Sequence, residues 1–199
     1  IQTIVLDKTG TLTQGKPTVT DYVTVQGTAN SHEIKLLELI AAIEQRSEHP
    51  LAEAIVQYAK SQGVNFPLPE PEKFAAVAGM GVEGMVTGRW VQIGTLRWFD
   101  EQGIDTQIET VQGTALLGHQ IAWETASKTT AWIAIDGKIE GLIGIADALK
   151  PSSESAIKAL QKMGLEVVLL TGDNQHTAEA IAHQLHIPRI FAEVRPDQK

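Results

Sequence analysis

Asp7 is the first residue in the chain that could do covalent chemistry. It ends the apolar run Ile1 to Leu6 and is followed at once by a turn that contains Gly10. An aspartate beside the free backbone N–H groups of such a turn can help to bind phosphate. Its carboxylate can also attack phosphorus to form an acyl phosphate. An aspartate that only accepts turn hydrogen bonds is the alternative for an isolated motif of this kind.

Two further groups could bind a ligand. Glu44 lies five residues before His49, inside the string that ends Ser47-Glu48-His49-Pro50. Pro50 is well placed to begin a helix that Ser47 or His49 would cap, so a purely structural role is one interpretation. The glycines of residues 79–84 (GMGVEG) are typical of a bulged hairpin as well as of a phosphate loop. Strand-like residues continue to Val86, which disfavours a dinucleotide-binding helix after these glycines.

The elements that would position Asp7 form a parallel sheet. A long segment separates the apolar runs Ile1 to Leu6 and Leu165 to Leu170. Apolar residues recur at helical spacing before the second run, at about 152–163, and after it, at about 177–185. Continuously apolar strands that alternate with helices indicate a parallel sheet covered on both faces. Active sites of such sheets form at the carboxyl ends of strands, where Asp7 and residues 171–174 stand.

The middle of the chain has a different pattern, in which antiparallel strands and helices are mixed. The expected strands are Thr18–Val25, Arg89–Gly94, Thr130–Ile135 and Lys138–Ile145, and the expected helices span about 31–46, 50–62 and 106–126. We therefore predict an α/β protein in which a Rossmann-like parallel-sheet domain, residues 1–15 and 142–199, receives an inserted α+β domain. That insert, residues 16–141, is built on an antiparallel sheet.

Composition and charge exclude several functions. The 199 residues include no cysteine, which excludes thiol catalysis and a thiolate metal site. The net charge of −8 lies wholly in residues 17–140, which hold 16 acidic and 8 basic residues. Such a surface repels nucleic acid. No apolar run is long enough to span a membrane.

Residues 7–13 (DKTGTLT) resemble the phosphorylation motif of the P-type ATPases, within the haloacid dehalogenase-like superfamily. Phosphatases of that superfamily carry a second aspartate two residues after the nucleophile, as general acid and base. Thr9 stands there and cannot do the same proton transfer. An acyl phosphate at Asp7 should then persist, which suits a transporter better than a phosphatase. Residues 44–50 resemble the SEHP signature of the heavy-metal branch of this family.

The resemblance implies roles for individual residues. The implied catalytic residues are Asp7, Lys8, Thr9, Thr171 and the Lys199 of a P-x-x-K element, with Asp7 and Thr9 as ligands of Mg2+. The implied nucleotide-binding residues are Glu44, His49, Gly79, Gly81, Val82, Gly94, Asp147, Gly172 and Asp173. Thr95 departs from the family's usual asparagine after Gly94. The implied cofactors are ATP and Mg2+. Lys8, Thr171 and Lys199 would share with Mg2+ the neutralisation of charge during phosphoryl transfer.

The resemblance implies the ATP-binding and phosphorylation region of a heavy-metal cation ATPase, with copper(I) as the ion. We expect an excised cytoplasmic unit of a larger transporter, because the 199 residues contain neither the family's membrane helices nor its Mg2+-binding G-D-G-x-N-D segment. Binding of ATP without sustained turnover is the expected behaviour. The expected partners are the transporter's membrane helices, its actuator and metal-binding domains, and a metallochaperone.

Two alternatives remain open from the sequence. One is a haloacid dehalogenase-like phosphatase whose insert serves as a cap over the substrate. The other is a nucleotide-binding module that does no catalysis, for which the complete motif at Asp7 would be a coincidence.

Overall fold

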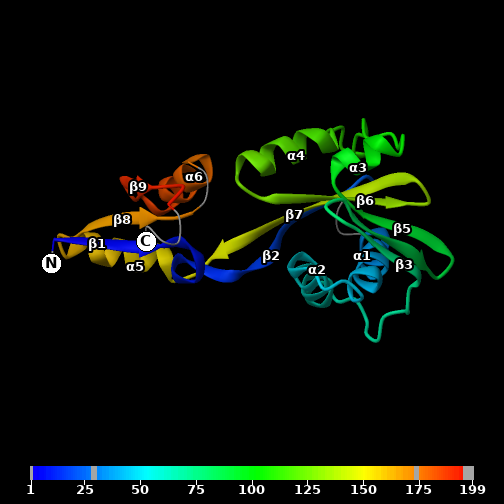
Figure 1. Cartoon of the computed structure of the whole chain (residues 1–199), viewed down its shortest axis with the longest axis horizontal. Coiled ribbons are helices and arrows are strands. Elements are labelled where there is room, and N and C mark those ends of the chain that lie inside the picture. The colour runs from blue at the N-terminus through cyan, green and yellow to red at the C-terminus, as the bar shows by residue number, and fades with distance from the viewer. Residues whose placement is uncertain (1, 28–30, 173–174, 195–199) are drawn as a thin grey trace. The chain divides into compact units, whose positions relative to one another are not determined.

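The computed structural model describes residues 2–27, 31–172 and 175–194, and it consists of two compact units (Figure 1). Unit 1 comprises residues 1–16, 125–127 and 147–199, and unit 2 comprises residues 17–124 and 128–146. Two long strands, β2 (Thr13–Thr24) and β7 (Lys138–Leu149), carry the chain from one unit to the other. Within the described ranges, no helix has the length and apolar character needed to cross a membrane.

Unit 1 is built on a three-stranded parallel sheet in the order β1-β8-β9. Its elements are β1 (Thr3–Asp7), an irregular helical turn η1 (Lys8–Leu12), α5 (Ser153–Lys162), β8 (Glu166–Leu170), α6 (Gln175–Leu185) and β9 (Arg189–Phe191). The core joins β8 to both helices through Ile157, Val167, Leu169, Ala178 and Ala182, all of which are buried. The predicted parallel sheet is confirmed.

Unit 2 is built on a six-stranded sheet in the order β2-β7-β6-β5-β4-β3, which contains the predicted hairpin of β6 and β7. Its remaining elements are α1 (Ser31–Glu44), α2 (Pro50–Ser61), β3 (Glu72–Val77), β4 (Gly81–Val86), β5 (Arg89–Gly94), α3 (Leu96–Glu101), α4 (Leu116–Thr125) and β6 (Thr129–Ile135). The pairs from β3 to β7 are antiparallel, as predicted.

Helices cover both faces of this sheet, α1 and α2 on one and α3 and α4 on the other (Figure 1). The side chains of β6 alternate between the two faces of the sheet. Ile133 and Ile135 belong to the core beneath α1 and α2, whereas Trp132 and Ala134 belong to the core beneath α3 and α4. Successive side chains of a strand point to opposite faces, so one strand supplies both cores.

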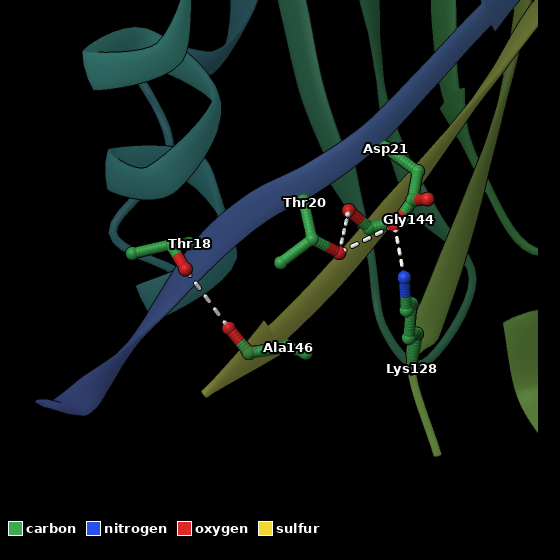
Figure 2. A network of polar contacts seen from close by, with 6 residues as sticks. All are labelled: Thr18, Thr20, Asp21, Lys128, Gly144 and Ala146. Carbon is green, nitrogen blue, oxygen red and sulfur yellow. Dashed lines mark hydrogen bonds and ion pairs between the residues drawn. The ribbon is translucent and has the colours of Figure 1, made fainter. Parts of the chain in front are cut away.

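Polar contacts hold β2 beside β7 within unit 2 (Figure 2). The Thr18 hydroxyl donates to the Ala146 carbonyl at 3.2 Å. Lys128, which directly precedes β6, forms an ion pair with Asp21 on β2. Both side chains of this pair are only about a quarter exposed, at 22% and 26%. This ion pair joins β2 to the residue immediately before β6.

One prediction about local structure was wrong, and one helix was missed. The helix predicted over 106–126 begins only at Leu116, because residues 106–115 form a loop closed by the bridge between Glu109 and Ala115. Gly113 has a φ of +78° there, a conformation that ends any helical run. The short helix α3 was not predicted, since six residues carry too little periodicity to detect.

Leu37 provides a test of the core beneath α1. It is fully buried, whereas Ile34 on the same helix is 37% exposed. Leu37→Ala should lower the free energy of unfolding of unit 2 by about 2–5 kcal/mol, through lost burial and a residual cavity. All four tryptophans lie in unit 2, so their fluorescence during urea unfolding follows this unit. Ile34→Ala is the matched control, with an expected change within about 0.5 kcal/mol; equal losses would contradict this packing.

Candidate functional site

A cavity of about 430 Å³ lies in unit 2, where the ends of α1 and α2 meet the turn between β3 and β4. Its wall is largely apolar and includes Ile55, Val77, Ile93, Ala131 and Ile145. The six insert residues predicted to hold a nucleotide all line it: Glu44, His49, Gly79, Gly81, Val82 and Gly94. An apolar pocket with a few convergent polar groups is typical of a small-molecule site.

His49 serves as the N-cap of α2, and it is also one of the residues that line the cavity. Its Nδ1 accepts a hydrogen bond from the Leu51 N–H at 3.2 Å, and the Ser47 hydroxyl accepts from the His49 N–H at 3.3 Å. A capping Nδ1 carries no proton, so the proton of the neutral ring is assigned to Nε2. The capping interpretation is therefore correct, and it leaves Nε2 available as a donor.

Glu44, the last residue of α1, is 7% exposed. Burial raises the pKa of this carboxyl to about 7, because the charged form loses its solvation. Perturbed carboxyls of this kind are concentrated in functional sites, although structural ones also occur.

The glycines that line the cavity are required at their positions for different structural reasons. Gly81 on β4 pairs directly with Gly94 on β5. A Cβ at Gly81 would lie 2.1 Å from the Ile93 carbonyl oxygen, and one at Gly94 would lie 2.5 Å from the Trp98 ring. These two positions exclude any side chain because their surroundings are too close. Gly79 has a φ of +70°, and a Cβ there would meet no atom within 4 Å, so this glycine is required by the turn alone.

Sequence reasoning missed the part of the cavity that β6 and β7 supply. Thr129, Thr130, Ala131 and Ile145 line it, although they are distant in the chain from the glycine-rich segment. No local pattern distinguishes them from other strand residues. Thr95 also lines the cavity, and its hydroxyl accepts from the Trp98 N–H at 3.3 Å as the cap of α3.

A larger and shallower hollow of about 860 Å³ shares Thr95, Thr129 and Thr130 with this cavity. Its two cations are already paired, Arg97 with Glu101 and Lys128 with Asp21. We give it less weight than the smaller cavity, which is more enclosed in apolar side chains and gathers the predicted residues.

The predicted phosphorylation centre lies in unit 1. Asp7 at the end of β1 is in register with Leu170 at the end of β8, so Thr171 follows on the neighbouring strand. Thr171 is 1% exposed, and its backbone N–H donates to the Phe191 carbonyl at 2.9 Å. The sheet thus brings Asp7 and the segment Thr171-Gly172 to the same edge, as expected for parallel strands. Lys199 and Asp173 lie outside the described residues.

Asp147 has a structural task within unit 1. Its Oδ2 accepts from the Thr13 hydroxyl at 2.6 Å, and its Oδ1 accepts from the Gly15 N–H at 2.9 Å. The Thr13 hydroxyl also accepts from the Gly10 N–H at 3.1 Å. Lys150 donates to the Gly10 carbonyl from the other side. The turn after Asp7 is therefore held in place by residues from a distant part of the chain, the end of β7 and the residue that follows it.

The described residues contain no group of three or more histidine, aspartate or glutamate side chains that could hold a metal by themselves. Mg2+ is usually bound by one or two carboxylates together with substrate phosphates and water. The oxygen donors predicted here, the Asp7 carboxylate and Thr9, fit that chemistry.

The fold and the position of Asp7 and Thr171 define a haloacid dehalogenase-like domain that carries an inserted α+β domain. A sequence model described as haloacid dehalogenase-like hydrolase matches residues 1–198. The chain belongs to this family.

Its more specific resemblance, to heavy-metal P-type ATPases, is confirmed by relatives. The probable copper-transporting ATPase PacS of Synechococcus elongatus is 49% identical over 199 residues, which are 100% of this chain and 25% of PacS. The chain therefore spans about a quarter of that relative's length.

Solved structures agree with this assignment. A zinc-transporting PIB-type ATPase in its E2.Pi state matches with a TM-score of 0.81 at 33% identity, over 100% of this chain and 30% of the other. The catalytic domain of the CPx-ATPase CopB-B matches with a TM-score of 0.61 at 25% identity, over 100% and 63% of the two chains. The predicted fold class is confirmed.

Asp147→Ala tests the contacts that hold the turn after Asp7. A hydrogen bond to a charged group contributes about 1.5–3 kcal/mol, so the Gly15 amide should exchange with deuterium about tenfold faster or more in this variant. Asp136 accepts from the Trp90 N–H at 2.8 Å in unit 2 and offers a matched control. Asp136→Ala should affect exchange at Trp90 and leave Gly15 unchanged. Unchanged exchange of Gly15 in Asp147→Ala would show that the carboxylate does not hold this turn.

Proposed function

We propose that the cavity of unit 2 binds the adenine nucleotide ATP. The observation that carries this proposal is the convergence on one apolar cavity of six residues from three separate chain segments, 44–49, 79–82 and Gly94. An adenine ring suits a pocket lined mainly by aliphatic side chains together with a carboxyl and an imidazole. The matching CopB-B structure, which concerns conformational changes upon nucleotide binding, supports the same assignment.

His49 permits a test that separates binding from helix capping. Asparagine caps helices well, whereas alanine does not. His49→Asn should keep α2 intact and still weaken ATP binding about tenfold or more, measured by calorimetry. His49→Ala should lose the same affinity and also about 1 kcal/mol of stability. If His49→Asn binds ATP as tightly as the unaltered chain, the ring has no part in binding.

We further propose that the whole protein is an ATP-driven copper(I) transporter in which the γ-phosphoryl group passes from ATP to Asp7. In that step an Asp7 carboxylate oxygen bonds to phosphorus, the bond to the bridging oxygen breaks, and ADP leaves. Mg2+ held by Asp7 and Thr9 would neutralise phosphate charge. Lys8, Thr171 and Lys199 would stabilise the transferring group, which is the protein's main task in such reactions. Asp147, Gly172 and Asp173 complete the proposed nucleotide contacts.

Several features support this larger proposal. Relatives that match 98–100% of this chain are named as copper-transporting or copper-exporting ATPases. Thr9 occupies the position at which a phosphatase would need an acid or base, so a long-lived phosphoprotein is favoured over rapid hydrolysis. The proposed partners are the membrane helices, actuator and metal-binding domains of the same transporter, and a metallochaperone. The described chain would then lie at the cytoplasmic face of the membrane.

Asp7→Asn tests the phosphorylation step in the full-length transporter. With γ-labelled ATP and Mg2+, the unaltered protein should give an acid-stable phosphoprotein that hydroxylamine cleaves, as expected of an acyl phosphate. The variant should give none, because an amide is not a nucleophile toward phosphorus. It should still bind ATP, since the cavity proposed to hold the adenine does not include Asp7. Undiminished labelling of the variant would remove Asp7 from the mechanism.

A further inference from the structure

Ser153, the first residue of α5, uses its hydroxyl outside its own helix. The hydroxyl donates to the Leu12 carbonyl at 2.6 Å, although Leu12 lies 141 residues earlier in the chain. Only 4% of Ser153 is exposed. The preceding residue, Ser152, is the N-cap of α5, and its side chain makes no capping hydrogen bond. The hydroxyl of Ser153 therefore holds the segment after Asp7 and does not cap the helix.

Leu12 ends the turn after Asp7, and it is fixed through both its side chain and its carbonyl. The residue is 3% exposed, and its side chain belongs to the core of unit 1. Its carbonyl accepts a second hydrogen bond, from the Lys150 N–H at 2.9 Å. A carbonyl oxygen has two lone pairs, so these two bonds satisfy it completely. Without the bond to Leu12, the buried hydroxyl of Ser153 would lose its partner, which is costly.

The turn itself needs support of this kind, because its backbone is irregular. Thr9 and Gly10 have non-helical dihedral angles, and the φ of Gly10 is +76°. One end of the turn is fixed where Asp7 is in register with Leu170 on β8. The other end is Leu12, only five residues further along. A shift of the Leu12 carbonyl would therefore be passed on to the backbone N–H groups beside Asp7.

We propose that Ser153 is a positioning residue for the phosphorylation of Asp7. Its hydroxyl fixes the end of the turn, and it thereby sets where the backbone N–H groups lie relative to the transferring phosphoryl group. Ser153 acts through Leu12 and does not line the cavity of unit 2. This inference rests on the proposed phosphoryl transfer to Asp7, and it adds to that step a residue from another part of the chain.

Ser153→Ala in the full-length transporter is the central test, with γ-labelled ATP, Mg2+ and rapid acid quenching. A displacement of about 1 Å at a reacting group can slow a reaction about a hundredfold. Because Lys150 still holds Leu12, we expect phosphoprotein formation at saturating ATP to be about tenfold slower. The loss should appear in this maximum rate and not in the ATP concentration needed for half of it. An unchanged maximum rate overturns the inference.

Ser155 offers a matched control on the same helix. Its hydroxyl donates to the Ser152 carbonyl at 2.9 Å, a bond that stays at the beginning of α5. Ser155→Ala therefore removes a hydroxyl and a hydrogen bond without touching the turn after Asp7. Its phosphorylation rate should stay within about twofold of the unaltered rate. Equal slowing by both alanine variants would assign the effect to helix stability and overturn the inference.

Two further variants distinguish the hydrogen bond from the packing of Ser153. Ser153→Thr keeps the hydroxyl donor and should recover most of the phosphorylation rate. Ser153→Cys keeps a side chain of similar shape but is only a weak donor, so it should slow the reaction. If Ser153→Ala does not fold, the comparison of these two variants decides the question, and equal unaltered rates for both overturn the inference.

Hydrogen exchange of the 199-residue chain reports on the turn without any reaction. The Gly10 N–H donates to the Thr13 hydroxyl at 3.1 Å. In Ser153→Ala this amide should exchange about threefold faster or more, because the end of the turn is held by one bond fewer. In Ser155→Ala it should exchange at the unaltered rate. Unchanged exchange of Gly10 in Ser153→Ala would show that the hydroxyl does not order the turn.

The outcomes also separate this inference from the proposed function. If the unaltered transporter forms no phosphoprotein, phosphoryl transfer to Asp7 is wrong and the inference fails with it. If the unaltered transporter is phosphorylated and Ser153→Ala is phosphorylated equally fast, the role of Ser153 is overturned and the proposed function stands.

Discussion

The insertion of unit 2 into the chain of unit 1 depends on one constraint. The chain must re-enter unit 1 close to the point at which it left. Here β2 leaves unit 1 and β7 comes back, and the two are neighbours in the same sheet. Closing a loop of this length costs conformational entropy once, and the cost grows only slowly with loop length. Contacts such as Thr18 to Ala146 and Thr13 to Asp147 then secure the pair on either side of the junction. Both the cavity and the turn after Asp7 are positioned by this shared pair.

Structural and functional tasks coincide at several residues instead of excluding one another. His49 both caps α2 through its side chain and lines the cavity. Gly81 and Gly94 are demanded by the close approach of neighbouring atoms, and they also leave the cavity wall free of side chains. For residues of this kind, a structural role in capping or packing is compatible with a role in binding. Glu44 differs, because burial of its carboxyl disfavours the charged form, and among the described residues no hydrogen bond or ion pair offsets that cost.

Prediction from sequence succeeded where the signal is local and strong. The strand Arg89–Gly94 has the predicted bounds, and the 3.6-residue repeat of α5 and α6 located both helices to within about two residues. It failed where the pattern is short or interrupted. Residues 106–115 have helix-forming composition but contain Gly113 in a left-handed conformation, and α3 has less than two turns. The edge strands β3 and β9 were also not predicted; each is short or irregular and has a partner on one side only.

The sequence by itself determined the types of chemistry available and the family. An aspartate after an apolar run, a threonine two positions later and a chain without cysteine are facts of composition and order. Only the tertiary structure decided which residues share a cavity, because Glu44, Gly79, Thr130 and Ile145 are brought together by sheet pairing over long chain separations. The burial of Glu44 was likewise decided by the tertiary structure. Burial of Glu44 raises the pKa of its carboxyl to about 7, a change that its position in the sequence alone does not indicate.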